Sequence, residues 1–298
     1  MDDRLPVHRC WPVRREWEEF VSETATATAT TSLLDAAEIE AYHRDGYVVP
    51  RFRLPAADLS RLQTLMASLV AENPGLINKP IVSPHVPGGG VRELKTSGDW
   101  MDIATHPSIV DMVEQLAGPD IILWGTTVFY KRAMQGPATA WHRDGQAWPI
   151  APLATTSVWI AATDSTTENG CLRVIPGSHK AKRVGEHVFV DRDDLIVRRT
   201  LAADEFDETL ARDIELAAGQ MVMFDVFTVH GAAHNRGSRP RAGYALRFMP
   251  ATSHFDHDAA RYRDEPGYAH DTRALLLVRG VDRCGRNDFR RGHPALVA

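Results

Sequence analysis

The pattern of apolar residues changes along the chain, from a helical period in the first third to an alternating one in the rest. Between residues 56 and 72, leucines recur every three or four positions, which places them on one face of an amphipathic helix. Similar spacing predicts helices at about 33–46, with Ser32 as its polar cap, and at about 107–117. We expect the apolar faces of these helices to pack against a sheet.

From residue 121 onward the period shortens to two, which is typical of strands. Apolar and β-branched runs separated by turns are found at 121–131, 156–162, 171–175, 212–224 and 241–249. Residues 47–50 are predicted to form a further short strand, and residues 274–278 either a buried strand or a helical turn. Helices followed by many short strands predict a helix-buttressed β-sandwich or jelly roll.

Two segments interrupt these periods. Residues 73–99 contain four prolines and the run Gly88-Gly89-Gly90, and an irregular segment of this length in a compact domain is commonly a lid or a binding loop. Residues 1–31 end in a Thr/Ala run without large apolar side chains, so we expect a flexible leader there. The remainder, 32–298, is predicted to be a single domain.

The overall composition narrows the classes of partner. The formal net charge of −5 creates no positive field, which argues against nucleic acid or membrane as a partner and favours a small-molecule substrate. No apolar stretch approaches the ~20 residues that a membrane span requires. The three cysteines are widely spaced without a CxxC pair, which gives neither a disulfide framework nor a zinc finger and favours a cytoplasmic protein. The sequence does not predict an oligomeric state.

Candidate chemistry comes from His-x-Asp tripeptides, because an open Fe(II) site commonly uses two histidines and one carboxylate. The chain contains three such tripeptides, His43-Arg44-Asp45, His142-Arg143-Asp144 and His254-Phe255-Asp256. A chain with 13 histidines is expected to contain about one by chance, so the context of each tripeptide has to decide.

The context favours His142 and Asp144 as metal ligands. Residues i and i+2 of an extended strand project to the same side, whereas in a helix they point about 200° apart. His142 follows the apolar strand at 121–131 and a turn of small residues. His43 instead lies at the end of a predicted helix, where an imidazole stabilises the helix without any ligand role.

The third ligand is expected on a later strand. The apolar run at 220–229 leads directly into His230, and the end of a strand fixes the direction of a side chain. His234 is the alternative ligand. Eleven residues after His230, Arg241 opens a further strand that we expect to run beside it. Its guanidinium can bind a carboxylate in the same cavity through two parallel hydrogen bonds.

Together these motifs resemble those of the phytanoyl-CoA dioxygenase (PhyH-like) family of Fe(II)/2-oxoglutarate-dependent oxygenases, over roughly residues 33–280. The matching segments are 42–49, 141–145, 168–179 and His230-Gly231 followed by Asn235 and Arg241. The resemblance implies a mainly β fold with flanking helices around a double-stranded β-helix (jelly-roll, cupin-like) core. It also implies that His179, which ends the third segment, is structural rather than a ligand.

The resemblance assigns roles to individual residues. The implied iron ligands are His142, Asp144 and His230. The residues implied to bind 2-oxoglutarate are Arg241 at its distal carboxylate, Thr127, Trp159 and, through a looser alignment, Lys95.

The implied reaction is hydroxylation of a C–H bond, with O2 consumed and with succinate and CO2 as coproducts. Related halogenases lack the carboxylate ligand, so Asp144 favours hydroxylation over halogenation. The residues expected to face the substrate are Gln146, Trp148 and Arg143. No further catalytic residue beyond the metal centre is predicted.

The substrate itself is less constrained. Cations near the expected mouth of the site, Lys79, Arg92, Lys95 and Arg143, favour a small polar or anionic molecule such as an organophosphonate, an amino acid or another metabolite. An acyl-CoA or natural-product hydroxylase is an alternative. A jelly-roll protein that binds a metal without catalysis is a second one, because a fold does not establish an activity.

Overall fold

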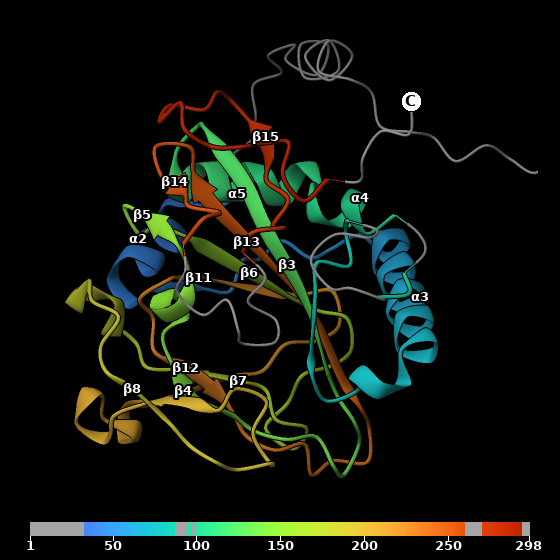
Figure 1. The fold of residues 1–298 in the computed structure, drawn as a ribbon. Coiled ribbons are helices and arrows are strands. Elements are labelled where there is room, and N and C mark those ends of the chain that lie inside the picture. Colours follow the sequence, from blue (N-terminus) through green and yellow to red (C-terminus); the bar gives the residue numbers. More distant parts are fainter. Residues whose placement is uncertain (1–32, 87–93, 97–98, 260–269, 294–298) are drawn as a thin grey trace, which may run out of the picture. The chain divides into compact units, whose positions relative to one another are not determined.

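Two antiparallel β-sheets form the centre of the fold (Figure 1). The larger sheet has the order β1 (Tyr47–Val48), β11 (Met221–Asp225), β6 (Thr156–Ala161), β13 (Arg241–Pro250), β3 (Ile121–Lys131) and β15 (Leu276–Arg279), with β2 (Pro80–Val82) paired to β3. The smaller sheet has the order β10 (Arg212–Ile214), β7 (Leu172–Val174), β12 (His230–Ala232) and β4 (Thr139–His142). Two separate two-stranded sheets pair β14 (His254–Phe255) with β5 (Ile150–Ala151) and β8 (His187–Phe189) with β9 (Arg199–Leu201).

The computed structural model describes residues 33–86, 94–96, 99–259 and 270–293. Residues 33–298 cluster into one compact unit. The predicted leader at 1–31 lies outside the described residues.

The strands of the larger sheet separate two different environments, because successive side chains of a strand point to opposite faces. On β13, Tyr244 and Leu246 belong to a cluster shared with the helices, whereas Ala245 packs toward the smaller sheet. On β6, Ile160 belongs to the first cluster and Trp159 to the second. The larger sheet therefore has an outer, helix-covered face and an inner face that meets the smaller sheet.

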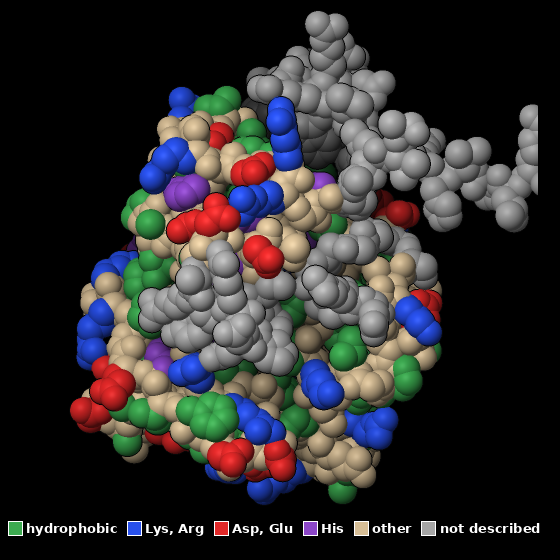
Figure 2. Space-filling view, viewed as in Figure 1, with side chains coloured by type: hydrophobic (Ala, Val, Ile, Leu, Met, Phe, Trp, Pro, Cys, Tyr) green, Lys and Arg blue, Asp and Glu red, His purple; other side chains and the backbone are tan. Residues whose placement is uncertain are grey.

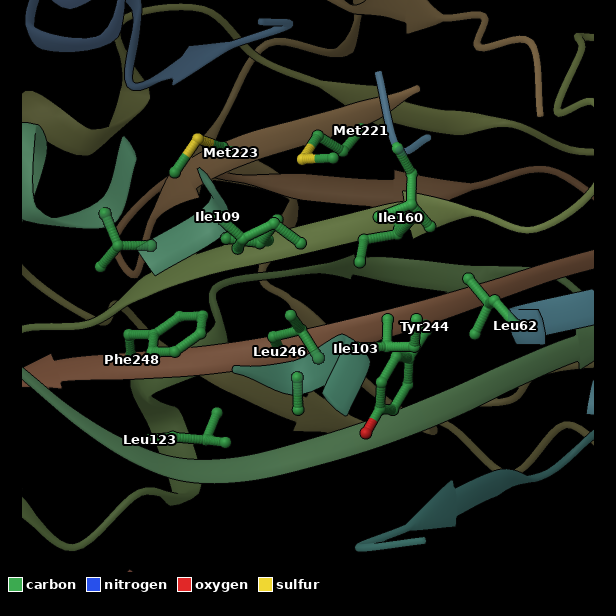
Figure 3. Packing of buried hydrophobic residues seen from close by; sticks show 14 of the residues in the cluster. Leu62, Ile103, Ile109, Leu123, Ile160, Met221, Met223, Tyr244, Leu246 and Phe248 are labelled. Carbon is green, nitrogen blue, oxygen red and sulfur yellow. The ribbon is translucent and has the colours of Figure 1, made fainter. Parts of the chain in front are cut away.

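Helices cover the outer face. They are α2 (Ala36–Asp45), α3 (Ala56–Glu72), α4 (Trp100–Ala104) and α5 (Pro107–Ala117). Figure 3 shows Leu62 of α3, Ile103 of α4 and Ile109 of α5 packing against side chains of the long strands. In Figure 1, α3 and α4 lie on one side of β3 and β13, and β4, β7 and β12 lie on the other. Short 3-10 helices connect the remaining elements at Pro74–Leu76 (η1), Asp144–Ala147 (η2), Ser178–Ala181 (η3), Ala203–Glu205 (η4) and Glu208–Leu210 (η5).

Several local predictions change in the structure. The cap of α2 is Asp35, which accepts the Glu38 amide while the Glu38 side chain accepts the Asp35 amide. The segment 73–99 is not wholly irregular, since it contains η1 and β2. The run 212–224 is two strands rather than one: β10 ends at Ile214, and a turn in which Gly219 adopts a left-handed conformation with φ 86° precedes β11.

The surface that Figure 2 shows carries interspersed Lys, Arg, Asp and Glu side chains. None of the described helices combines the length and apolarity needed to cross a membrane.

The C-terminus of α2 gives a test of the packing between α2 and the loop before β12. Gly46 has φ 84°, and a Cβ there would lie 2.5 Å from Nδ1 of His179 and 2.7 Å from Oγ1 of Thr228. Gly46→Ala should lower the free energy of unfolding by about 1 kcal/mol for the backbone and by roughly 1–3 kcal/mol more for the clash. Gly285→Ala is the matched control, because Gly285 has φ 64° and a Cβ there would have no neighbour within 4 Å among the described residues. Equal losses in the two variants by chemical denaturation would contradict the packing argument.

Candidate metal centre

Three potential ligands from distant parts of the sequence converge between the two sheets. His142 is the last residue of β4, Asp144 is the first residue of η2, and His230 is the first residue of β12. One ligand atom from each lies within 4.8 Å of the others. The Nε2 atoms of His142 and His230 lie 3.6 Å and 3.8 Å from Oδ1 of Asp144. This spacing suits three ligands on one face of a single ion.

Direct strand pairing brings the two histidines together. His230 lies opposite His142 in the antiparallel register of β12 and β4, and their ring centroids are 4.2 Å apart. The predicted position of His230 at the end of a long strand was wrong. Strand β11 ends at Asp225, the chain crosses to the smaller sheet over residues 226–229, and His230 begins β12.

Asp144 joins the histidines through an extended link. Arg143 has φ −110° and ψ 136°, so His142 and Asp144 project to the same side, as expected for i and i+2 of an extended segment. The Ser157 hydroxyl on β6 donates to Oδ2 of Asp144 at 3.2 Å. Ser157 therefore fixes one carboxylate oxygen and leaves Oδ1 toward the histidines.

Backbone carbonyls orient both imidazole rings. Nδ1 of His142 lies 2.8 Å from the Ala140 carbonyl oxygen, and Nδ1 of His230 lies 2.9 Å from the Thr228 carbonyl oxygen. Because a carbonyl oxygen only accepts, Nδ1 carries the hydrogen in each ring and Nε2 keeps its lone pair toward Asp144. This is the tautomer in which an imidazole binds a metal through Nε2.

The electrostatics of the group also suit a divalent metal. Burial lowers the pKa of His230 to about 4, and the nearby His142 ring acts in the same direction, so His230 is a neutral ligand. Burial alone would raise the pKa of the Asp144 carboxyl, but His230, His142 and Arg247 outweigh it and hold that pKa well below its usual range. Two imidazoles and one carboxylate are the donor set of a non-haem Fe(II) site with open positions.

The competing histidines lie in other surroundings. Nε2 of His234 is 3.1 Å from Oδ2 of Asp194, beside a surface cavity of about 590 Å³. His43 is exposed at the end of α2, where its carbonyl oxygen accepts a hydrogen bond from Nε2 of His179 at 3.1 Å. Among the described residues, the group His142, Asp144 and His230 is the one cluster of His, Cys, Asp and Glu side chains with metal-binding geometry.

Arg241 was predicted on a strand beside that of His230. It lies on the same inner face, but its strand is not adjacent to that of His230. It opens β13 of the larger sheet, whereas His230 belongs to the smaller sheet. Arg241 is 3% exposed, its Nε has no hydrogen-bond partner among the described residues, and its Cζ lies 4.9 Å from the Trp159 ring centroid. Burial lowers its pKa only to about 10, so it remains a cation facing the space between the sheets.

The family model described as phytanoyl-CoA dioxygenase (PhyH) matches residues 42–243. The chain belongs to the phytanoyl-CoA dioxygenase family. An ectoine dioxygenase of Nocardia farcinica is 25% identical over 281 residues, which cover 83% of this chain and 88% of that protein.

Solved structures of PhyH-like enzymes share the fold. The non-heme monooxygenase ThoJ in its apo form has a TM-score of 0.64 at 25% identity, covering 85% of this chain and 87% of that chain. EctD from S. alaskensis with 2-oxoglutarate and 5-hydroxyectoine has a TM-score of 0.60 at 20% identity, covering 78% and 82%. The predicted family, jelly-roll core, enzyme class and cofactors are thereby confirmed: this PhyH-family protein is an Fe(II)- and 2-oxoglutarate-dependent dioxygenase.

Of the other residues predicted to bind the cosubstrate, two lie on the inner face of this PhyH-family protein and one does not. Trp159 and Thr127 lie on the inner face, and Oγ1 of Thr127 accepts a hydrogen bond from Nη1 of Arg247 at 2.9 Å. Lys95 is exposed, and its backbone is bonded to the Asn73 side chain at the end of α3. The structure does not bring Lys95 together with the others.

The residues predicted for the substrate also differ in their surroundings. Gln146 is buried, and its Oε1 has no hydrogen-bond partner among the described residues. Trp148 stacks beside Arg247, whose Cζ is 5.4 Å from the ring centroid. Lys79 lines the surface cavity beside His234 rather than the metal centre, and Arg92 lies outside the described residues.

Arg143 has protein partners for its side chain. Its Nε donates to the Phe227 carbonyl at 3.1 Å and its Nη1 to the Val184 carbonyl at 3.2 Å, and Nη1 also lies 3.3 Å from Glu205. The Arg143 amide hydrogen bonds to Nε2 of His187 at 3.2 Å. These contacts tie the loop that carries β8 to the metal centre.

Two cationic residues on the inner face were not predicted from the sequence. Lys131 lies directly opposite Arg241 in the β3–β13 register, and Arg247 lies opposite Ser157 in the β6–β13 register. The alternation of side chains along β13 could have predicted Arg247, because Arg241 and Arg247 are six residues apart and therefore share a face. Lys131 shares its face of β3 with Thr127 by the same rule.

The metal assignment predicts a clear contrast between histidines. Asp144→Ala and His230→Ala should each weaken Fe(II) binding by more than the roughly 10- to 100-fold that is typical of losing a hydrogen-bond partner of a ligand. His234→Ala is the matched control and should bind Fe(II) like the wild type. Anaerobic titration calorimetry measures the affinities. Unchanged affinity in His230→Ala, or lost affinity in His234→Ala, would refute the assignment.

Proposed function

We propose that His142, Asp144 and His230 hold Fe(II) in this enzyme and that it hydroxylates a C–H bond of a small molecule. The observation that carries the proposal is the convergence of three ligand atoms whose imidazoles are both held with Nε2 toward the carboxylate. When bound, iron, 2-oxoglutarate and O2 supply the oxidising chemistry, with succinate and CO2 as coproducts. Asp144 occupies the position that a halide needs, which favours hydroxylation.

Arg241 is the proposed partner of the distal carboxylate of 2-oxoglutarate. A buried guanidinium with an unused Nε fits a carboxylate, since such pairs form short, charge-assisted hydrogen bonds. Trp159 packs against the guanidinium and limits its rotation. Thr127 is placed on the same face, toward the metal end of β3.

Lys131, which lies directly opposite Arg241, is a second cationic side chain on the inner face. Its side chain is fully buried, and its Nζ donates to the Ala233 carbonyl at 2.5 Å. Burial, together with the charge of Arg241, lowers the pKa of Lys131 to about 6. We assign Lys131 to the distal carboxylate together with Arg241, because an arriving anion offsets both effects and favours the protonated amine.

Gln146 and Trp148 remain proposed substrate-facing residues, since both lie on or just after η2, which begins with Asp144. Arg143 is better assigned to positioning. Its hydrogen bonds to two carbonyls and Glu205 hold the β8 loop against the segment that carries His142 and Asp144.

The proposed function is tested by 2-oxoglutarate turnover. Wild-type protein should form succinate from 2-oxoglutarate only with Fe(II) and O2 present. Arg241→Ala should raise the KM for 2-oxoglutarate roughly 10- to 100-fold, as expected for the loss of a hydrogen-bonded charge, while Arg239→Ala, an exposed neighbour before β13, should not change it. Absence of Fe(II)-dependent succinate formation would refute the function. An unchanged KM in a folded Arg241→Ala variant would refute the cosubstrate assignment alone.

The role of Lys131 predicts a proton linkage. At pH 7.5 the Lys131 amine is largely neutral, because its pKa is lowered to about 6, and a bound carboxylate raises that pKa, so binding should take up a proton. Titration of metal-loaded protein with 2-oxoglutarate should therefore give enthalpies that depend on the ionisation enthalpy of the buffer. Lys131→Met should lose this dependence, and Lys180→Met, at an exposed lysine, should keep it. Buffer-independent enthalpies in the wild type would contradict the assignment.

A further inference from the structure

Arg273 is a buried cation that the proposed iron and 2-oxoglutarate chemistry does not use. It precedes β15 and is 4% exposed. Its Nη1 donates to Oγ of Ser83 at 3.0 Å, and its Nε has no hydrogen-bond partner among the described residues. Burial lowers its pKa only to about 10, so it stays charged. Within the described part of the chain Arg273 forms no ion pair, and a buried charge in that condition is costly.

The guanidinium of Arg273 lies over the inner face of the larger sheet. A Cβ placed on Gly125 of β3 would lie 3.7 Å from Nη1 of Arg273. Gly125 shares its face of β3 with Thr127, two residues further along. The guanidinium of Arg273 therefore lies within van der Waals distance of the Gly125 position on the inner face.

A continuous row of residues connects Arg273 to the metal centre. Gly125 is paired with Arg247, and Arg247 is paired on its other side with Ser157. Ser157 in turn donates to Oδ2 of Asp144. Arg273 therefore lies across the inner face from the proposed iron ligand, at the opposite end of β13 from Arg241.

The charges of the loaded site do not account for Arg273. Iron, the Asp144 carboxylate and the two carboxylates of 2-oxoglutarate together leave one negative charge, which Arg241 and the protonated Lys131 more than balance. Arg247 lies nearer to Asp144 than Arg273 does in the row, and its charge acts on the Asp144 carboxyl. The charge on Arg273 calls for an anion that neither the described protein nor the cosubstrate supplies.

We propose that Arg273 binds an oxyanion group of the substrate, so that the substrate class is small molecules carrying a carboxylate, phosphonate or phosphate. Trp148 and Trp124, whose ring centroids are 4.5 Å apart, provide an apolar wall beside Arg247 for the carbon skeleton. This inference rests on the proposed function, because it takes the iron and 2-oxoglutarate sites as given. It assigns recognition of the anion to the buried Arg273 rather than to the exposed Lys79 and Lys95, which were predicted from the sequence.

Equilibrium binding tests the inference without turnover. Protein loaded anaerobically with Fe(II) and 2-oxoglutarate is titrated by calorimetry with hexanoate, butylphosphonate and the neutral hexanamide. At least one of the two anions should bind roughly 10-fold or more tightly than hexanamide, and the preferred one identifies the oxyanion. Arg273→Gln should weaken that anion roughly 10- to 100-fold, as expected for loss of a charged hydrogen-bond donor. Arg290→Gln, at an exposed arginine of the same segment, should leave its affinity unchanged.

If Arg273→Gln does not fold, the comparison of the anions with hexanamide on the wild-type protein still decides the test. Arg273→Lys, which retains the charge, is a second variant, and we expect it to bind the anion with intermediate affinity. Anions that bind no more tightly than hexanamide, or full anion affinity in a folded Arg273→Gln variant, would overturn the inference. Wild-type protein that forms succinate from 2-oxoglutarate with Fe(II) but shows no anion preference would sink only this inference. Failure to form succinate at all would sink the proposed function instead.

Discussion

The pairing of His230 with His142 across β12 and β4 is the interaction on which the site depends. Residues directly opposite in an antiparallel pair share a face, whereas a shift of one residue would turn His230 to the other side. A register irregularity between His230 and Ala232 follows immediately, and such bulges occur next to active sites, where they aim side chains. Asp144 then joins this pair to the larger sheet through Ser157. The metal centre therefore also connects the two sheets.

The larger sheet divides its two faces between stability and chemistry. Its outer face packs apolar side chains such as Tyr244, Leu246 and Phe248 against the helices, and burial of such groups is the main favourable contribution to folding. Its inner face carries Arg241, Arg247, Ser157 and Trp159 instead. Because alternate residues of one strand serve the two faces, a single strand such as β13 both anchors the helices and lines the site.

Much of this arrangement could be predicted from sequence, and the exceptions have physical causes. The helices and long strands followed from local periodicity, and the motif spacing led to His142, Asp144 and His230. The local pattern did not reveal that β11 ends at Asp225, because the apolar side chains of 226–229 continue across a turn between sheets. Arg273 was missed for another reason: its placement against Gly125 is a contact between residues nearly 150 positions apart, for which the sequence contains no short-range signal.

The buried cations of the inner face show how the site balances stability against ligand binding. Lys131 can reduce the cost of burial by releasing its proton, which is the meaning of a pKa lowered to about 6. Arg241 and Arg273 cannot do so, since an arginine stays charged in proteins, and each therefore lowers the stability of the empty protein. A ligand that supplies the missing negative charge binds the folded chain and not the unfolded one, so it returns this free energy as stabilisation of the fold. With the proposed ligands assigned to Arg241 and Arg273, the same charges that destabilise the ligand-free protein are the ones that select anions.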